Sequence, residues 1–370
     1  MGNSNTQQLK KSTLLKLLKD FRGVFSFSLI VCYLLLAVFA YFLAPDSSSN
    51  ANSMHLNIAR QSPGFKCYLI QLPSAENQQE SVGFMKRLLY GTGNASPAIA
   101  VSHYRLVNDS LFYRLWESES SAAPEQVISK AFTEDEVAFE KNYITSKTFH
   151  LGTDKYGRDM LSRMIIGTRI SLSIGAVSVL ISLVLGISLG AIGGYFTGWI
   201  DQVIVWLINV TWSIPSLLMV IAISVAFGGK GFWQIFIAVG LTMWVEVARI
   251  VRGQVKSVKE EQYITAAKVL GFSHFRILFK HIIPQVLSPV IVISAANFAA
   301  AILIESGLSF LGIGVQPPTP TWGGMIKDHY PYIILGKAWL ALIPGIAIMS
   351  MVMAFMLLGN ALRDALDVKN

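Results

Sequence analysis

Residues 170–200 read ISLSIGAVSVLISLVLGISLGAIGGYFTGWI, and none of their side chains carries a charge. A helix needs about 20 mostly apolar residues to cross a bilayer. This stretch is therefore long enough for one transmembrane helix and the turn that follows it. Gly193, Gly194 and Gly198 mark the expected turn.

Four more stretches lack charged residues, namely 24–43, 202–229, 282–304 and 338–361. A sixth, 231–245, is shorter and can continue past Glu246 if that carboxylate faces protein or the membrane interface. Only 14% of the chain is charged and its mean hydropathy is +0.51, whereas soluble domains carry about 25% charge. We therefore predict an all-α membrane protein with six transmembrane helices, and an ordinary cytosolic enzyme is excluded.

The basic residues lie beside the apolar stretches. Five of them precede 24–43, and seven lie in the loop 248–281. Because Lys and Arg favour cytoplasmic flanks, we expect both termini and that loop in the cytoplasm. The same placement explains the net charge of +8 without a nucleic-acid partner. Stretch 24–43 is longer than the apolar core of a signal peptide, which favours an uncleaved anchor over a cleaved leader.

Residues 45–149 differ sharply in composition, being polar and rich in Ser and Asn. The runs 102–106 and 111–115 flank Asn108-Asp109 and predict a β-hairpin. Residues 84–90 before Gly91 predict a short helix, and Thr133 with Glu136 predicts a capped helix toward Tyr143. Segments 47–52 and 118–123 resemble linkers. We expect an α+β insert outside the membrane.

These patterns predict the following organisation: a cytoplasmic tail (1–22), a first transmembrane helix (23–44), an extracytoplasmic insert (45–160) and a core with five helices (161–370) that contains the cytoplasmic loop 248–281. Within this loop, residues 262–270 predict a short helix with small side chains at 266 and 267 and a stop at Gly271. Pro284 is expected to open the next span, where its missing N–H costs least.

The loop resembles the EAA loop of ABC importer permeases, which has two Ala, a Gly four residues later and a Pro thirteen residues after the Gly. Ala266, Ala267, Gly271 and Pro284 match each spacing. Thr265 stands where the family has its Glu. The resemblance implies that this loop couples the chain to an ATPase subunit, with Ala266, Ala267 and Gly271 on the docking surface.

Three further segments resemble the dipeptide, oligopeptide and nickel importers. They are HLGTDKYGRD at 150–159, IESGLSFLG at 304–312 with QPP at 316–318 and WG at 322–323, and RDALD at 363–367. The resemblance covers about residues 1–45 and 150–370, and it indicates the second of two paired permease subunits. It implies the type I ABC importer permease fold, a bacterial inner membrane location and the role of half a translocation pore for di- or oligopeptides. The implied partners are a homologous permease, two ABC ATPases and an extracytoplasmic substrate-binding protein.

No sequence signature of catalysis is present. The chain lacks GxxxxGK[ST] and HExxH. Residues 186–190 fit GxSxG by letter, but they lie inside the uncharged stretch 170–200 and not at the strand-to-helix turn which that motif requires. Neither the two Cys nor the six His have metal-ligand spacing. We therefore expect a non-enzymatic chain without cofactors of its own, with ATP and Mg²⁺ bound by the partner ATPases.

Pro215 and Glu305 are the candidate residues of the substrate path. Pro215 is expected to break its span. Glu305 could contact the permeating solute or cap a turn. Glu246 has an intramembrane carboxylate, but an interfacial place beside Arg249 and Arg252 is the favoured interpretation. Gly186, Gly190 and Gly194 are expected to form a helix-packing face.

Three alternatives stay open at this point. The chain could serve a nickel or other small-solute importer. It could be a secondary transporter, although apart from Glu246 and Glu305 its spans lack the carboxylates, and the chain lacks the repeats, that such proteins use. It could also be a membrane-anchored sensor that acts through 45–149, which would leave the EAA-like loop unexplained.

Overall fold

The computed structural model describes residues 16–17, 19–71, 83–93, 98–107, 110–116, 125–128, 136–228 and 231–366. The chain divides into two compact units. The helical unit comprises Met1–Leu34, Ser171–Gln316 and Ile346–Asn370, and the mixed unit comprises Leu35–Ile170 and Pro317–Gly345.

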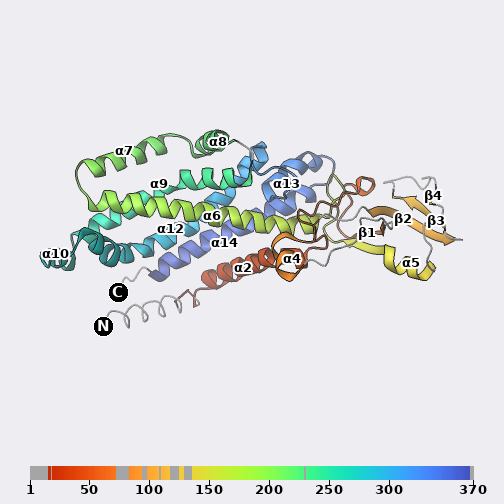
Figure 1. Ribbon diagram of the computed structural model, residues 1–370, viewed down its shortest axis with the longest axis horizontal. Coiled ribbons are helices and arrows are strands. Elements are labelled where there is room, and N and C mark those ends of the chain that lie inside the picture. Colours follow the sequence, from red (N-terminus) through yellow and green to blue (C-terminus); the bar gives the residue numbers. More distant parts are fainter. Residues whose placement is uncertain are drawn as a thin grey trace. The chain divides into compact units, whose positions relative to one another are not determined.

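The helical unit is built from long apolar helices (Figure 1). Its elements are α2 (Phe21–Val38), α6 (Met160–Tyr195), α7 (Trp199–Ser213), α8 (Ser216–Ala226), α9 (Phe232–Lys259), α10 (Gln262–Val269), α11 (His274–Arg276), a π-helical turn (Ile277–Ile282), α12 (Ile283–Leu311) and α14 (Trp339–Leu366). The last turn of α2 and the first turns of α6 and α14 belong to the mixed unit. Within the described residues, five helices are long and apolar enough to cross a membrane. A sixth span results if α7 and α8 are counted as one.

The predicted span 202–229 is broken in the middle. Helices α7 and α8 meet at an angle of 97°, and Ile214 and Pro215 between them have extended backbone. Proline has no N–H and disfavours helical geometry in the residue before it. The prediction of a break at Pro215 is therefore confirmed.

Glycines on α6 allow it to pack closely on α9. A methyl group at Gly186 would lie 2.5 Å from the Val247 Cβ, and one at Gly190 would lie 2.5 Å from the Ala248 carbonyl oxygen. Gly194 faces Val255 in the same way. The predicted packing face is confirmed, because any larger side chain would push the helices apart.

The mixed unit contains a five-stranded antiparallel sheet with strand order β4-β3-β2-β1-β5. The strands are β1 (Phe65–Gln71), β2 (Ala98–Val107), β3 (Ser110–Leu115), β4 (Gln126–Ile128) and β5 (Ile144–Phe149). The predicted hairpin is present as β2 and β3, with Val107 paired to Ser110. Its turn, Asn108-Asp109, lies outside the described residues.

Short helices complete this unit: α3 (Ala40–Leu43), a 3-10 turn (Leu56–Ile58), α4 (Phe84–Tyr90), α5 (Glu136–Tyr143), α13 (Trp322–His329) and a second 3-10 turn (Tyr330–Ile333). The predicted helix 84–90 is thus confirmed. Helix α5 is present as well, while its predicted capping residue Thr133 lies outside the described residues. Helices combined with an antiparallel sheet confirm the α+β character predicted for the insert.

Two apolar clusters cover the sheet. One contains Ile58, Cys67, Leu69, Ala100 and Phe149, and the other contains Ile70, Val101, Leu111 and Tyr113. Burial raises the pKa of the Cys67 thiol to about 11, so this cysteine is a core residue with little thiolate character.

Candidate functional site

The loop between α9 and α12 folds into helix α10. The extended backbone of Glu261 begins the helix, and its carbonyl accepts hydrogen bonds from the N–H groups of Ile264 and Thr265. At the other end Gly271 has a φ of +75°, and the Phe272 N–H bonds to the Ala267 carbonyl. Only glycine adopts this left-handed geometry without steric cost, which explains why the helix stops there.

The two alanines of α10 differ in exposure. Ala267 is 6% exposed and packs with Ile264, Val255 and Ile277, whereas Ala266 is exposed. The expectation that both lie on one outer surface is therefore wrong for Ala267. Adjacent residues on a helix point about 100° apart, so two neighbouring alanines need not share one surface.

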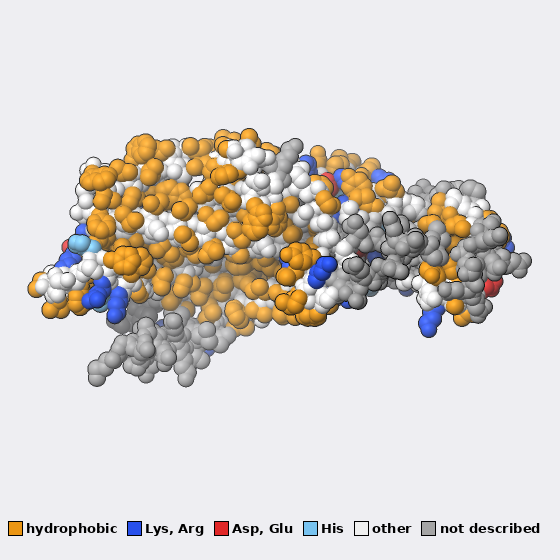
Figure 2. All heavy atoms as spheres, in the orientation of Figure 1, with side chains coloured by type: hydrophobic (Ala, Val, Ile, Leu, Met, Phe, Trp, Pro, Cys, Tyr) orange, Lys and Arg blue, Asp and Glu red, His pale blue; other side chains and the backbone are white. Residues whose placement is uncertain are grey.

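Large apolar side chains project from the loop. Val269 is 83% exposed, Leu270 is 72% exposed and Phe275 is 71% exposed. We define the apolar loop surface as Tyr263, Val269, Leu270, Phe275 and Phe279. Figure 2 shows hydrophobic and basic side chains together at the end of the helical unit that carries α10. A group of exposed apolar side chains outside the spans is typical of an interaction site.

Sequence reasoning missed these side chains as a group. The signal was present in the sequence as bulky apolar residues just after the two alanines, in a loop that is otherwise rich in basic residues. The aromatic rings of Phe275 and Phe279 lie 4.3 Å apart between centroids, one helical turn from each other. Both rings lie on a helical segment that precedes Pro284. The sequence analysis predicted no helix there.

Pro284 lies in the first turn of α12, as predicted, but helix also precedes it. Residues His274–Leu311 form one continuous apolar helix, in which Ile277–Ile282 is π-helical. Pro284 cannot donate to a carbonyl one turn earlier, and π-helical turns occur where the regular hydrogen-bond ladder is interrupted. The proline thus shapes the connection between the loop and the span.

The start of α7 is fixed to α9 by an ion cluster. Asp201 accepts two hydrogen bonds from Arg252, at 2.5 and 2.9 Å, and one from Lys256 at 2.7 Å. Because the arginine binds in a bidentate manner, the pair has a defined geometry. The cluster anchors α7 near the end of α9 that leads into the loop.

A cavity of about 310 Å³ lies where α7 and α8 meet. Its lining is contributed by α7, α8, α9, α12 and the break between α7 and α8: Thr211, Trp212, Ile214, Pro215, Ser216, Met219, Thr242, Met243, Val245, Glu246, Ala300 and Ile304. Pro215, one of the two predicted path residues, lines this cavity. Glu246 lies in it too and is exposed, so it faces open space within the unit.

Glu305 does not line that cavity. Its side chain is fully buried, and Ser309, one turn later on α12, donates a hydrogen bond of 2.7 Å to its Oε1. Helix α12 ends two residues further on at Leu311, and the Gly312 that follows has a φ of +81°. The two predicted path residues are therefore not brought together.

Comparison with known families decides the class of this chain. Residues 182–369 match the family described as the binding-protein-dependent transport system inner membrane component. This region contains α10, the cavity and the whole loop. The chain belongs to this family.

Curated relatives of this inner membrane component are permeases. The glutathione transport system permease protein GsiD of Pectobacterium atrosepticum is 39% identical over 224 residues, covering 60% of this chain and 74% of the relative. The dipeptide permease DppC of Bacillus subtilis is 39% identical over 247 residues, covering 67% and 75%. The oligopeptide permease OppC of Bacillus subtilis is 38% identical over 224 residues, covering 60% and 73%.

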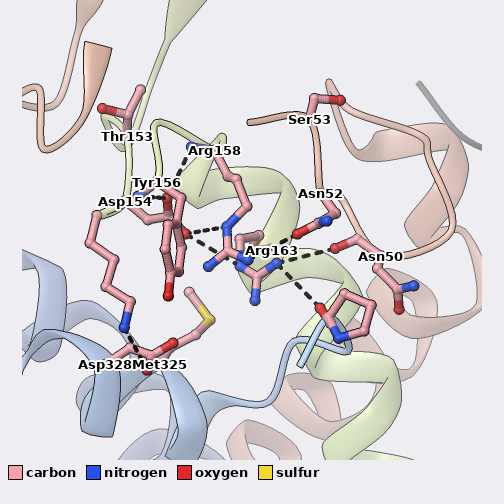
Figure 3. A network of polar contacts seen from close by, with 12 residues as sticks. Asn50, Asn52, Ser53, Thr153, Asp154, Tyr156, Arg158, Arg163, Met325 and Asp328 are labelled. Atoms are coloured by element: carbon pink, nitrogen blue, oxygen red, sulfur yellow. Dashed lines mark hydrogen bonds and ion pairs between the residues drawn. The ribbon is translucent and has the colours of Figure 1, made fainter. Parts of the chain in front are cut away.

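The segment 150–159 of the inner membrane component forms a buried polar network in the mixed unit (Figure 3). Asp154 is fully buried and accepts a hydrogen bond of 2.6 Å from the Arg158 Nε, while the Arg163 Nε lies 3.7 Å away. The two arginines in turn bind the Asn52 side chain and the Asn50 carbonyl. A buried carboxylate is tolerated only when it is paired in this way.

This network corrects the interpretation of 47–52 as a linker. Ser48 and Ala51 are buried, and Asn50 and Asn52 supply oxygens to Arg163 and Arg158. The other expected linker, 118–123, lies outside the described residues. Segment 47–52 is thus an ordered turn that completes the arginine sites.

The motif at 150–159 also contacts α13. Lys155 forms an ion pair of 3.0 Å with Asp328, and its N–H lies 3.3 Å from the His329 Nε2. Burial lowers the pKa of His329, although Asp154 and Asp328 oppose this. Burial also raises the pKa of Asp159, whose carboxylate accepts a hydrogen bond from Ser162.

Trp322, the first residue of the WG pair in the sequence, is a buried packing residue. It is 1% exposed, and its indole N–H donates to the Met164 carbonyl at 3.1 Å. A methyl group at Gly167 would lie 3.0 Å from the Trp322 ring. The tryptophan therefore seats α13 on the first turns of α6.

Proposed function

We propose that this inner membrane component is the permease subunit of an ATP-driven importer for di- and oligopeptides, in which it forms half of the translocation pore. The single observation that carries the proposal is the apolar loop surface within a family of binding-protein-dependent transporters. The printed names of the relatives, which include dipeptide, oligopeptide and glutathione permeases, support a peptide as the solute.

The proposed assembly has four further subunits. They are a homologous permease, two ABC ATPases that bind ATP and Mg²⁺, and an extracytoplasmic substrate-binding protein. This chain itself is non-catalytic in the proposal, because its task is to transmit motion and to line the path.

In this account the loop docks on an ATPase through its exposed side. Ala266 and the apolar loop surface contact the ATPase, whereas Ala267 holds α10 on the helical unit. Gly271 sets the turn after α10, and Pro284 sets the connection to α12. When the ATPases close on ATP, α10 moves with them and tilts the long helices that it is packed against.

The proposed orientation has both termini and the loop in the cytoplasm of a bacterial cell, and the mixed unit on the outer side. The basic flanks support it, since Lys and Arg are retained on the cytoplasmic side. Lys256 and Lys259 in the last turn of α9 belong to these flanks.

The proposed path for the solute passes the cavity at Pro215. The break between α7 and α8 leaves room there for a ligand, as discontinuous helices do in other transporters. Glu305 has a positioning role in this proposal: it does not line the cavity, and its hydrogen bond with Ser309 joins the last turns of α12, next to the lining residue Ile304.

Deletion of the gene tests the proposal directly. Depletion of a defined mixture of di- to hexapeptides from the medium is followed alongside nickel accumulation. We expect selective loss of peptide uptake that the intact chain restores. Unchanged peptide uptake with reduced nickel accumulation would move the assignment to a metal importer.

A further inference from the structure

Glu246 is a carboxylate on α9, directly after the uncharged stretch 231–245. It is the fifteenth residue of α9 (Phe232–Lys259), and its neighbours Val245 and Val247 are buried while Glu246 is exposed. Charged side chains within spans are costly and mark binding or transport sites by default. The Glu246 side chain also lines the cavity where α7 and α8 meet.

The cations nearest to Glu246 along α9 are engaged elsewhere. Arg252 and Lys256 bind Asp201, and the Arg249 guanidinium lies 3.5 Å from the centre of the Trp212 ring. None of the hydrogen bonds and ion pairs found among the described residues involves Glu246. Its negative charge is therefore open to a ligand from outside the chain.

The cavity around Glu246 suits a small peptide. Its volume of about 310 Å³ is at the lower end of the range for small-molecule sites. Of its twelve lining residues, all of them described, Glu246 is the sole charged one, and Pro215, Met219 and Ile304 supply apolar wall. A carboxylate beside apolar walls attracts a cation more strongly than one in water does.

We propose that Glu246 binds the N-terminal ammonium group of the peptide as it passes through the membrane. This inference rests on the proposed function, because it assigns a residue to the passage of peptides. Every unblocked peptide carries this ammonium group, whatever its sequence. The apolar wall accepts side chains of many kinds, so one carboxylate would suit a transporter that handles varied peptides.

The test uses the complete complex of permeases and ATPases in lipid nanodiscs, without the binding protein and without nucleotide. A photoreactive benzoylphenylalanine replaces Met219 in the cavity. Labelling is measured against the concentration of radioactive trialanine and of its desamino analogue, in which a hydrogen replaces the terminal amino group. Omitting the binding protein removes its own preference for the ammonium group.

We expect half-maximal labelling at about 10-fold lower concentration for trialanine than for the analogue, the size expected for a hydrogen bond to a charged group. Glu246→Gln should weaken the binding of trialanine and leave that of the analogue unchanged. The two peptides should then reach half-maximal labelling at similar concentrations. Thr242→Val alters the same cavity without changing its charge and should keep the preference.

An equal preference in the wild-type complex and in Glu246→Gln would overturn the proposal. So would a complex that no longer assembles with Glu246→Gln, because Glu246 would then be a structural ion-pair partner of another subunit. If trialanine fails to label the wild-type cavity while cells still import peptides, the role of Glu246 is wrong and the proposed function stands. If cells import no peptide through this chain, the proposed function itself fails.

Discussion

Ala266 and Ala267 are neighbours on α10, yet Ala267 is buried among Ile264, Val255 and Ile277 while Ala266 is exposed. Helix α10 therefore packs on the helical unit through the face that carries Ala267, and the face that carries Ala266 is exposed. Val269, the last residue of α10, and Leu270 after it extend the exposed side. This division of roles leads to the first prediction.

Leu270→Glu should reduce peptide uptake at least 10-fold, because a charge in an apolar contact is left desolvated and unpaired. Membrane levels of the chain should not change, since Leu270 is 72% exposed and exposed substitutions cost within about 0.5 kcal/mol. Thr265→Glu is the matched control. It adds the same charge to the same helix at the position where the family pattern has Glu, so uptake should persist. Equal loss in both variants would argue against a specific apolar contact.

Gly271 should tolerate asparagine better than alanine. At a φ of +75° an L-residue costs about 1–2 kcal/mol, and asparagine adopts this geometry more readily than alanine does. No atom lies within 4 Å of a methyl group placed there, so backbone strain decides the effect of small residues. Gly271→Trp should abolish uptake without loss of membrane insertion, because its bulk blocks docking. Uptake assays on the three variants, with blots for membrane levels, check this order, and normal uptake by the tryptophan variant would refute the role of the loop.

Gly190→Leu should destabilise the helical unit by at least about 1–3 kcal/mol, the usual cost of overpacking. Even a methyl group there would lie 2.5 Å from the Ala248 carbonyl oxygen on α9. Gly253→Leu, on α9 itself, is the control, because nothing lies within 4 Å of that position. The thermal unfolding midpoint is measured for the purified wild-type chain and for each of the two variants. Similar midpoints for the two variants would contradict the close α6–α9 contact.

Asp154→Asn should cost the mixed unit about 3–5 kcal/mol, because it leaves buried arginines without their counter-charge. Asp328→Asn breaks the more exposed pair with Lys155 and should cost no more than about 1 kcal/mol. Limited proteolysis and thermal unfolding distinguish the two variants. A larger effect from Asp328→Asn would reverse the order assigned to these ion pairs.

Acidification should loosen the mixed unit through His329. Burial holds the pKa of His329 below 6.5, so the unfolded chain binds a proton at a higher pH than the folded chain does. The stabilisation is therefore complete above pH 6.5 and is lost as the pH falls below it. His329→Asn should flatten the decline in thermal midpoint between pH 7.5 and 5.5. His103→Asn, at an exposed position on β2, should leave the slope unchanged, and an unchanged slope in His329→Asn would exclude this residue as the cause.

Local patterns in the sequence predicted the elements well and their mutual contacts less well. The uncharged stretches, the break at Pro215 and the helix 84–90 are each encoded within a few neighbouring residues, so periodicity and turn chemistry were sufficient. The angle of 97° between α7 and α8 and the π-helical turn before Pro284 depend on packing that spacing does not reveal.

The same reason explains what sequence reasoning missed in the sites. The contact between Arg163 and the Asn50 carbonyl joins residues 113 positions apart, and no local pattern in 47–52 announces it. Likewise, the open position of Glu246 depends on Asp201 binding the cations further along α9. The direction of Ala267 was predictable in principle from helix geometry, but the resemblance that named both alanines did not distinguish their faces.

The most direct measurement is uptake of a labelled dipeptide into proteoliposomes that contain the two permeases and both ATPases, with the binding protein supplied on the outer side. Our account predicts accumulation that requires ATP on the ATPase side and that falls at least 10-fold in Leu270→Glu. Accumulation that persists without ATP and follows a proton gradient would contradict it and would make the chain a secondary transporter.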